Sequence, residues 1–270
     1  MNATSKSAPR LIVFSDLDGT LLDHATYAWD AANEALDKMR ELGIPLVLAS
    51  SKTASEIADL RAQMGFEDVP AIVENGAGLL PAGAGAGADT SEHDAIRKAL
   101  DELPAELRAC YEGFSDWPVE AVADKTGLPL QQAEKAARRQ FSEPGLWNGS
   151  DEDLAKFEAL LGEKGIRARQ GGRYLTLSFG ATKADQMAAI ISGFEPRPVT
   201  MALGDAPNDV EMIETADFGI VIRNTHGPGI PPLSGEDDGR IARTERPGPE
   251  GWNIAVLERI AQLYDKTKEG

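Results

Sequence analysis

The sequence predicts an α/β protein: a doubly wound parallel, Rossmann-like sheet with an inserted α+β cap domain. Three observations predict this fold. Short apolar runs alternate with helical segments over residues 11–80 and again over residues 183–264, as is typical of parallel sheets. Several of these runs end in carboxylates, at the edge where open α/β sheets bind their ligands. Between the two parts, the alternation gives way to helices and one hairpin.

The first apolar run, Leu11–Phe14, fits a strand that is buried on both faces of a sheet. It leads to Asp16 and Asp18, two carboxylates separated by one residue and followed by Gly19. Asp-Gly alone is common turn chemistry, but Asp16 still lies within the strand pattern. Because ionised carboxylates are costly to bury unless they are paired or bound to a metal ion, the pair predicts a cation site.

A helix and a second strand follow. Apolar residues near helical spacing predict a helix over residues 27–42, with Gly43 as its C-cap. Residues 44–49 fit a second buried strand, with its proline tolerated at the start. The strand leads to Ser50, whose hydroxyl could bind a ligand or cap the helix predicted over residues 57–64. The spacing alone does not decide between the two roles.

A third short strand, residues 71–73, ends in the polar sequence Glu74-Asn75-Gly76-Ala77. The alternating Gly/Ala run over residues 82–88 then breaks the pattern. It lacks the strand-to-helix context of a dinucleotide-binding loop, so we predict a flexible turn or linker there. Residues 1–10 are expected to form a loose polar leader.

The middle of the chain predicts the cap. Gly171-Gly172 joins two segments of alternating polarity, which is the pattern of a hairpin. We expect the cap at residues 83–181 and the core at residues 1–82 and 182–270, with a pocket at their interface. The elements predicted within the cap are helices over residues 94–103, 118–126, 130–141 and 151–161, a loop over residues 142–147, and strands over residues 166–170 and 173–178.

The sheet pattern resumes after Lys183. Residues 199–203 fit a buried strand that again ends in carboxylates, in the sequence Gly204-Asp205-Ala206-Pro207-Asn208-Asp209. The other elements predicted in this part are a helix over residues 184–191, a strand over residues 218–222, an irregular Pro/Gly-rich loop over residues 225–251 folded over the site, and a closing helix over residues 252–264.

Charge and composition narrow the choice of partners. The 270 residues contain 27 Lys and Arg against 44 Asp and Glu, a net charge of −17, which repels nucleic acid and anionic membranes. A phosphate site on such a chain needs its own local positive charge. We find no apolar run long enough for a membrane span and no signal peptide after Met1. The single cysteine, Cys110, excludes an internal disulfide and suits a reducing cytoplasm; the oligomeric state stays open.

Other catalytic patterns are not met. The three histidines, His24, His93 and His226, come without the Gly-x-Ser-x-Gly elbow that would indicate a Ser-His-Asp triad. The chain also has no P-loop that would indicate nucleotide hydrolysis.

Four motifs, in order along the chain, resemble those of the haloacid dehalogenase superfamily. Asp16-Leu17-Asp18-Gly19-Thr20 is similar to the first motif, Ser50 to the second, Lys183 to the third and residues 204–209 to the fourth. The insertion between the second and third motifs resembles the larger type of cap in this superfamily. The resemblance implies a Mg²⁺-dependent phosphatase that acts on a small phosphorylated sugar.

The resemblance also implies a role for each matching residue. Asp16 attacks phosphorus to form an aspartyl-phosphate, while Asp18 protonates the leaving oxygen and then activates water. Mg²⁺ is bound by Asp16, the main-chain carbonyl of Asp18, and Asp205. The remaining matching residues bind or orient these groups: Ser50 and Lys183 at the phosphoryl oxygens, and Asn208 and Asp209 around the metal and phosphate.

Finer features resemble the mannosyl-3-phosphoglycerate phosphatases. This resemblance implies a glycosyl-3-phosphoglycerate substrate whose carboxylate is bound by Arg173 and whose sugar hydroxyls are bound by Glu143, with Ser51, Asn75 and Asn208 as further substrate-binding residues. Residues 227–239 have no counterpart that we can match to that family. The segments that carry the resemblance are Ser50–Thr53, Glu74–Gly76, Phe141–Pro144, Gly171–Arg173 and Gly248–Asn253.

Two alternatives stay open. One is a phosphatase or phosphomutase of the same superfamily that acts on another sugar phosphate. The other is a non-catalytic binding protein that kept the fold, although the intact Asp16, Asp18 and Asp205 argue against it. The sequence does not distinguish mannose from glucose in the substrate.

Overall fold

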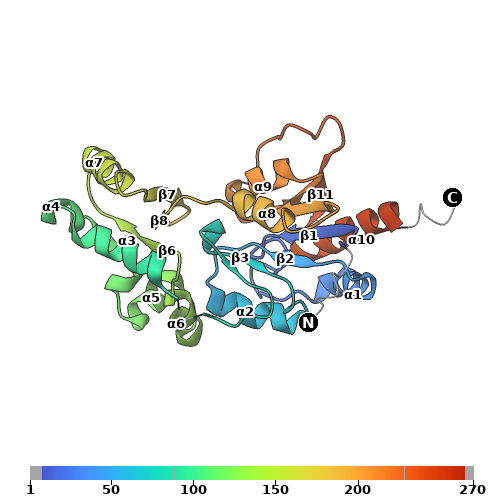
Figure 1. The fold of residues 1–270 in the computed structure, drawn as a ribbon, viewed down its shortest axis with the longest axis horizontal. Helices are drawn as coiled ribbons and strands as arrows, with labels where there is room; N and C mark the ends of the chain where they lie inside the picture. Colours follow the sequence, from blue (N-terminus) through green and yellow to red (C-terminus); the bar gives the residue numbers. More distant parts are fainter. Residues whose placement is uncertain (1–7, 88, 228, 265–270) are drawn as a thin grey trace.

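The protein has two lobes, each built on its own β-sheet (Figure 1). The structure is a computed structural model that describes residues 8–87, 89–227 and 229–264. Most of the predicted polar leader therefore lies outside the described residues. The large lobe holds a five-stranded sheet and the small lobe a four-stranded sheet.

The sheet of the large lobe is parallel throughout, with the strand order β11-β10-β9-β1-β2. This confirms the predicted doubly wound parallel sheet. The strand between β9 and β2, β1, has only buried residues, as its apolar sequence predicts. The five strands are β1 (Leu11–Ser15), β2 (Leu46–Leu48), β9 (Val199–Gly204), β10 (Phe218–Arg223) and β11 (Ile241–Pro247).

Helices cover both faces of this sheet. Alternate residues of a strand point to opposite faces, and Leu11 and Val13 pack with α1 and α10, while Ile12 and Phe14 pack with α8 and α9. The core is thus divided into two layers on either side of the sheet. The helices of the large lobe are α1 (Asn33–Leu42), α2 (Ala54–Gln63), α8 (Lys183–Ile191), α9 (Val210–Thr215) and α10 (Gly248–Tyr264).

In the large lobe, one predicted strand has a partner that was not predicted, and one predicted loop contains a strand. The third strand, β3 (Ala71–Val73), pairs in an antiparallel hairpin with β4 (Gly78–Leu80) and joins the main sheet through one bridge, Ala49 to Ile72. The segment predicted as an irregular loop contains β11, which pairs in parallel with β10. Most residues of β11 are exposed, and four of its seven residues are polar, so this edge strand carries no apolar signal.

The sheet of the small lobe is antiparallel, with the order β5-β6-β8-β7. Strands β7 and β8 form the predicted hairpin, in which Gly171 pairs with Tyr174. Helices α3 and α7 cover the face to which Leu175 and Leu177 point. The elements of this lobe are β5 (Tyr111–Gly113), β6 (Ser142–Trp147), β7 (Arg167–Gly171), β8 (Tyr174–Ser178), α3 (Ser91–Asp101), α4 (Ala105–Arg108), α5 (Val119–Thr126), α6 (Leu130–Ala137) and α7 (Asp151–Gly162).

Strand β6 corrects the prediction of a loop over residues 142–147. Pro144 and Gly145 disfavour a strand interior, yet β6 lies between β5 and β8. Strand β5 pairs with β6 only from Gly145 onward, so Pro144 lies where β6 has a partner on one side. The helix predicted over residues 130–141 ends at Ala137, because the chain must turn there to enter β6.

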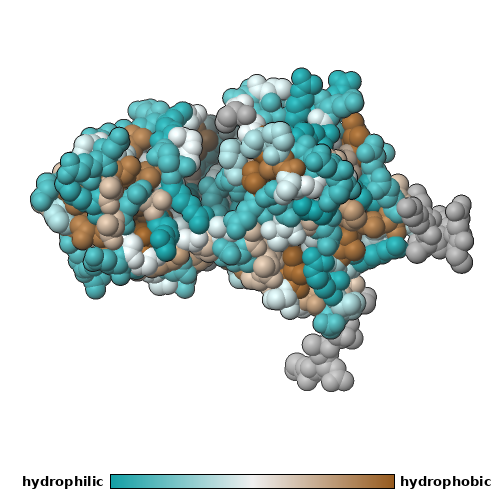
Figure 2. Space-filling model, turned by 90° about the horizontal axis from the view of Figure 1, so that it is seen from above, coloured by the Kyte–Doolittle hydropathy of each residue, from teal (hydrophilic) through white to brown (hydrophobic). Residues whose placement is uncertain are grey.

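The two lobes lie side by side, with α3, α4 and α7 on the side of the small lobe that faces away from the large lobe (Figure 1). Helix α6 of the small lobe packs against α2 of the large lobe. Seen from above, the surface is hollowed between the lobes, and the hollow is mostly hydrophilic (Figure 2). Within the described part of the chain, no helix combines the length and the apolar sequence needed to cross a membrane.

Candidate active site

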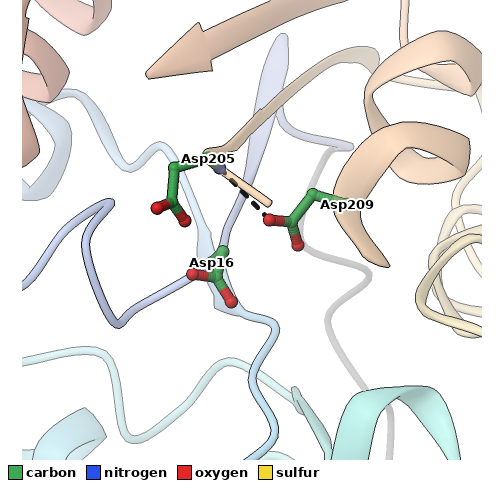
Figure 3. A group of neighbouring side chains, drawn as sticks. All are labelled: Asp16, Asp205 and Asp209. Carbon is green, nitrogen blue, oxygen red and sulfur yellow. Dashed lines mark hydrogen bonds between the residues drawn. The ribbon is translucent and has the colours of Figure 1, made fainter. Parts of the chain in front are cut away.

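Three carboxylates converge at the carboxyl-terminal edge of the parallel sheet (Figure 3). Asp16 directly follows β1 and Asp205 directly follows β9, and these two strands are neighbours. Asp209 lies in the short 3-10 turn after Asp205. One oxygen from each carboxylate lies within 4.8 Å of the others, and all three side chains are buried. The sheet therefore brings together two carboxylates that are 189 residues apart in sequence.

Two glycines let these carboxylates approach so closely. A Cβ on Gly204 would lie 2.4 Å from the Cβ of Asp209, and a Cβ on Gly19 would lie 2.7 Å from Oδ2 of Asp205. Gly19 also has φ of +83°, which favours glycine over other residues. The Gly-Asp and Asp-Gly pairs of the sequence are thus required by the packing of the cluster.

Lys183 supplies a buried positive charge to the cluster. Its Nζ lies 2.7 Å from Oδ1 of Asp16 and 2.7 Å from Oδ1 of Asp209. It is the first residue of α8, whose N-cap, Thr182, forms a capping box with Asp185. Burial alone would lower the pKa of Lys183, but the carboxylates of Asp16 and Asp209 outweigh it and raise that pKa. Lys183 therefore stays protonated at any physiological pH.

One lysine does not balance three buried carboxylates. Burial, together with the charges of Asp209 and Asp18, raises the pKa of Asp16 to about 8 despite the opposing effect of Lys183. Burial and Asp209 raise the pKa of Asp205 to about 6. The cluster thus needs a further positive charge to hold its carboxylates ionised at neutral pH. Mg²⁺ fits this donor set, because it prefers oxygen ligands and one or two carboxylates with waters and phosphate oxygens.

The cluster makes a prediction for the metal-free protein. Burial raises the pKa of Asp16 from its ordinary value of 3.8 to about 8 in the folded protein, so protonation of Asp16 contributes stability to the folded state. This contribution is present below the unfolded pKa and is lost as pH rises through the folded pKa. With chelator present, we expect the free energy of unfolding, measured by urea denaturation, to fall between about pH 5 and pH 8. Asp16→Asn should show a smaller fall, and equal falls in both proteins would contradict the assignment.

Asp18 lies apart from the three clustered carboxylates and is paired with Lys52. Its Oδ2 is 3.0 Å from the Lys52 Nζ, whereas its buried Oδ1 has no hydrogen-bond partner among the described residues. Burial would lower the pKa of Lys52, but Asp18 and Glu56 raise it. Lys52 also lies over the ring of Tyr27, with 5.1 Å between Nζ and the ring centroid. Only its place in the motif Ser50–Thr53 marks Lys52 in the sequence.

Ser50 follows β2, is buried and lies at the same edge of the sheet. Its Oγ accepts a hydrogen bond from the Lys52 N–H at 3.2 Å. The N-cap of α2 is Thr53, which forms a capping box with Glu56. The alternative role of Ser50 as a helix cap is therefore wrong, and the binding of a ligand by its hydroxyl stays a prediction. Ser51 is exposed beside it.

Three asparagines surround the cluster. Asn208 Nδ2 donates to Oδ1 of Asn75 at 3.1 Å, so these two predicted site residues lie together. Asn224 Nδ2 donates to Oδ2 of Asp205 at 2.8 Å, and thereby orients that carboxylate. No motif marks Asn224, and its only sequence signal is its place directly after a buried strand, β10, as with Asp16 and Asp205.

The two residues of the cap that were predicted to bind the substrate, Glu143 and Arg173, both have other partners in the structure. Glu143 is fully buried and opposite Leu177 in the register, so it points to the face covered by α3 and α7. Its oxygens are already bound to the side chains of His93 and Arg97 and to Ser115. A role for Glu143 at sugar hydroxyls stays a prediction, and these contacts favour a structural role.

Arg173 lies at the tip of the hairpin between β7 and β8. It is exposed and donates a hydrogen bond to the main-chain carbonyl of Lys125 at the end of α5. On the same sheet, Arg169 points to the face opposite Leu175 and Leu177, and its Nη2 donates to the Gly180 carbonyl at 2.9 Å. Gly180 belongs to the segment that runs from β8 to Lys183, so Arg169, which binds this link between the lobes, is a second candidate cation.

The fold and the site define the class of protein. A parallel α/β sheet carries buried carboxylates and a lysine at its carboxyl-terminal edge, and a lobe with its own antiparallel sheet stands beside them. The sequence profile of the haloacid dehalogenase-like hydrolases matches residues 13–156 and 151–228. Because these matches cover well over half of the chain, the protein belongs to that family.

Solved structures share the fold over nearly the whole chain. A phosphatase of the haloalkanoate (HAD) superfamily from Bacteroides thetaiotaomicron is 19% identical, covers 97% of this chain and 98% of its own, and has a TM-score of 0.61. The sucrose-phosphatase of Synechocystis is 18% identical over 94% of this chain and 98% of its own, with a TM-score of 0.57. A haloacid dehalogenase-like hydrolase from B. subtilis is 17% identical over 93% and 99%, with a TM-score of 0.58. At these identities, the likeness shows the fold alone.

Proposed function

We propose that the protein is a Mg²⁺-dependent phosphatase of phosphorylated sugars, with a glycosyl-3-phosphoglycerate as its substrate. One observation carries the phosphatase proposal: Lys183 lies 2.7 Å from Asp16 at the edge of the sheet, with Asp205 and Asp209 beside it. A buried cation next to a strand-end carboxylate suits an anionic substrate that a chain of net charge −17 would otherwise repel.

The first chemical step is attack by Asp16. One of its carboxylate oxygens forms a bond to phosphorus while the bond between phosphorus and the ester oxygen breaks. Asp18 gives a proton to that departing oxygen, so the sugar leaves as an alcohol. To do so, Asp18 must first leave its ion pair with Lys52 and take up a proton from solvent. Arrival of the substrate beside Lys52 offers that ammonium another anion to bind.

The second step releases phosphate from Asp16. Asp18, now a carboxylate, takes a proton from water, and the water oxygen attacks phosphorus. The bond between phosphorus and the Asp16 oxygen breaks, which restores Asp16 and the protonated Asp18 and yields inorganic phosphate.

The remaining residues hold the phosphoryl group and the carboxylates in place. Lys183 and Ser50 bind phosphoryl oxygens, whose negative charge the lysine offsets at low local dielectric. Asp16, Asp205 and the main-chain carbonyl of Asp18 would hold Mg²⁺, with Asp209 orienting them. When bound, Mg²⁺ supplies positive charge to the carboxylates and the phosphoryl oxygens.

The small lobe supports the proposal of a substrate larger than a simple phosphate ester. We place the cap at residues 83–181 and the core at residues 1–82 and 182–270, so that the hollow between them receives the sugar. Ser51, Asn75 and Asn208 are the proposed contacts on the core side. Arg173 is the proposed partner of the glycerate carboxylate, because a guanidinium can bind a carboxylate with two parallel hydrogen bonds.

The experiment that tests the function is phosphate release from a panel of esters in the presence of Mg²⁺. The panel contains mannosyl- and glucosyl-3-phosphoglycerate, sucrose phosphate, simple hexose phosphates and p-nitrophenyl phosphate. We expect the highest kcat/KM for a glycosyl-3-phosphoglycerate, with mannosyl tested first. A clear preference for another sugar phosphate would contradict the proposed substrate but leave the proposed phosphatase activity intact. No release from any ester would overturn both.

Substitution of Arg173 tests the proposed carboxylate contact. We expect Arg173→Ala to lower kcat/KM for the glycosyl-3-phosphoglycerate by ~10²-fold, as for a charge-assisted contact of about 3 kcal/mol. Hydrolysis of p-nitrophenyl phosphate, which has no carboxylate, should change little. Lys156→Ala, on the exposed face of α7, is the matched control for loss of one positive charge in the same lobe.

Two other results would contradict the role of Arg173. Equal losses on both substrates would mean that Arg173 acts through its bond to Lys125, by supporting the small lobe. A selective loss in Arg169→Ala, without one in Arg173→Ala, would move the carboxylate contact to the neighbouring strand.

A further inference from the structure

Glu74 is a buried carboxylate of the large lobe whose partners all belong to the small lobe. It is 2% exposed and directly follows β3. Its Oε1 accepts from the Gln140 N–H at 2.9 Å, and its Oε2 accepts from the Phe141 N–H at 3.2 Å and the Ser142 hydroxyl at 2.7 Å. The guanidinium of Arg139 lies 3.4 Å away. None of these contacts is used by the proposed chemistry.

The segment bound by Glu74 leads into β6, an inner strand of the small lobe's sheet. Residues 139–142 join α6 to β6, and β6 pairs with both β5 and β8. The same segment also binds the linker between the lobes, because the Gln140 amide donates to the carbonyls of Gly87 and Asp89 at 2.9 Å each. A single side chain of the large lobe thus binds three successive residues, Gln140, Phe141 and Ser142, where β6 begins.

The backbone at Glu74 is strained. Glu74, Asn75 and Gly76 have consecutive φ values of 52°, 60° and 93°. Left-handed conformations are uncommon for residues other than glycine, and they persist only where the surrounding contacts hold them. Two such residues in a row show that the position of the Glu74 carboxylate is held against a local conformational cost.

The other two residues of this turn contact the candidate active site. The Asn75 side chain accepts a hydrogen bond from Asn208, in the loop that carries Asp205. Gly76 is pressed against the start of α8, since a Cβ there would lie 2.1 Å from the carbonyl carbon of Thr182, the residue before Lys183. The turn formed by residues 74–76 therefore contacts three parts of the protein: the small lobe, the loop after β9, and the start of α8, where Lys183 lies.

We infer that Glu74 is a positioning residue that fixes the small lobe relative to the active site. The turn of residues 74–76 links the small-lobe segment 139–142 to Asn208 and to the start of α8, where Lys183 lies. Every partner of Glu74 is a hydrogen-bond donor, so a carboxylate fits the position and an amide, with its own N–H groups, does not. The inference rests on the proposed function only in the test that measures catalysis. The test by hydrogen exchange does not depend on it.

The first test is independent of activity. Hydrogen exchange of the full chain is measured for Glu74→Ala, Glu74→Gln and wild type, with thermal unfolding to confirm that each is folded. We expect the amides of Gln140 and Phe141 to exchange at least about tenfold faster in Glu74→Ala, and at least one of them to do so in Glu74→Gln, which keeps one acceptor oxygen; tenfold is the factor that corresponds to losing a bond to a charged group. Strands β1 and β9 should be unchanged. The control is Asp217→Asn, because Asp217 binds Thr200 within the large lobe and touches no residue of the junction.

The second test measures a difference between substrates. In Glu74→Ala we expect kcat/KM for the sugar phosphate that wild type hydrolyses best to fall by ~10-fold or more, chiefly through KM. We expect kcat/KM for p-nitrophenyl phosphate to change by less than about threefold, because a small ester needs little of the small lobe. Ser142→Ala, which removes one partner from the other side, should act in the same direction with a smaller effect, and it replaces Glu74→Ala if that variant does not fold.

Two results would overturn the inference. One is unchanged exchange at residues 140 and 141. The other is an equal loss on both substrates, which would place the effect of Glu74 in the active site itself. If wild type hydrolyses no phosphate ester, the proposed function is wrong. The exchange measurement still decides whether Glu74 positions the small lobe.

Discussion

Asp16→Asn is expected to reduce kcat by ~10⁴-fold with every phosphate ester, because an amide cannot form the acyl-phosphate that splits the reaction into two steps. The fold should persist, since the substitution removes one of three buried negative charges and leaves Lys183 paired with Asp209. Steady-state phosphate release and thermal unfolding measure the two effects.

Asp217→Asn provides the matched control for this substitution. Asp217 is also an aspartate with several hydrogen bonds in the large lobe, but it lies beside the start of β9 and not beside its end. We expect its variant to keep activity within a few-fold of wild type. If Asp16→Asn kept most of its activity, the covalent mechanism would be wrong.

Removal of divalent cations is expected to abolish turnover, and excess Mg²⁺ is expected to restore it. Without a cation, burial and the charges of Asp209 and Asp18 raise the pKa of Asp16, so a smaller share of the nucleophile is ionised at neutral pH. Ca²⁺ should not restore activity, because it prefers more ligands and longer bonds than Mg²⁺. Phosphate release in buffers with chelator, Mg²⁺ or Ca²⁺ makes this comparison.

A second readout separates binding of the cation from catalysis. Mg²⁺ should raise the midpoint of thermal unfolding of wild type, because a ligand that binds only the folded state stabilises it. Asp205→Asn should lose most of this shift, whereas Asp23→Asn, outside the cluster, should keep it. Full activity in excess chelator, or an equal shift in Asp205→Asn, would contradict the proposed metal site.

The parts of the fold that the sequence predicts are those with strong periodic signals. Strands β1 and β9 are largely apolar and almost entirely buried, so the carboxylates at their ends could be placed at one edge of a sheet. The hairpin β7–β8 was predictable because its turn contains two glycines between alternating segments. These are local features that the tertiary context did not override.

Elements whose pairing is decided by distant partners were not predictable. Strand β6 contains Pro144 and Gly145 and is held in place by β5 and β8. Strand β11 is an exposed edge whose sequence reads as a polar loop. In the site, the pairing of Lys52 with Asp18 and the bond from Asn224 to Asp205 join residues far apart in sequence. Likewise, only the register of β6 against β8 shows that Glu143 points to the covered face.

The most direct test of the proposed mechanism is to trap the phosphorylated enzyme. Wild type is mixed with Mg²⁺ and the best substrate, quenched in acid within one turnover, and digested with trypsin for mass spectrometry. We expect one phosphoryl group on the peptide Leu11–Lys38, located at Asp16, absent in Asp16→Asn and removed by hydroxylamine, which cleaves acyl-phosphates. Rapid phosphate release with no phosphoryl group on Asp16, or with the group on Ser50 instead, would contradict the account.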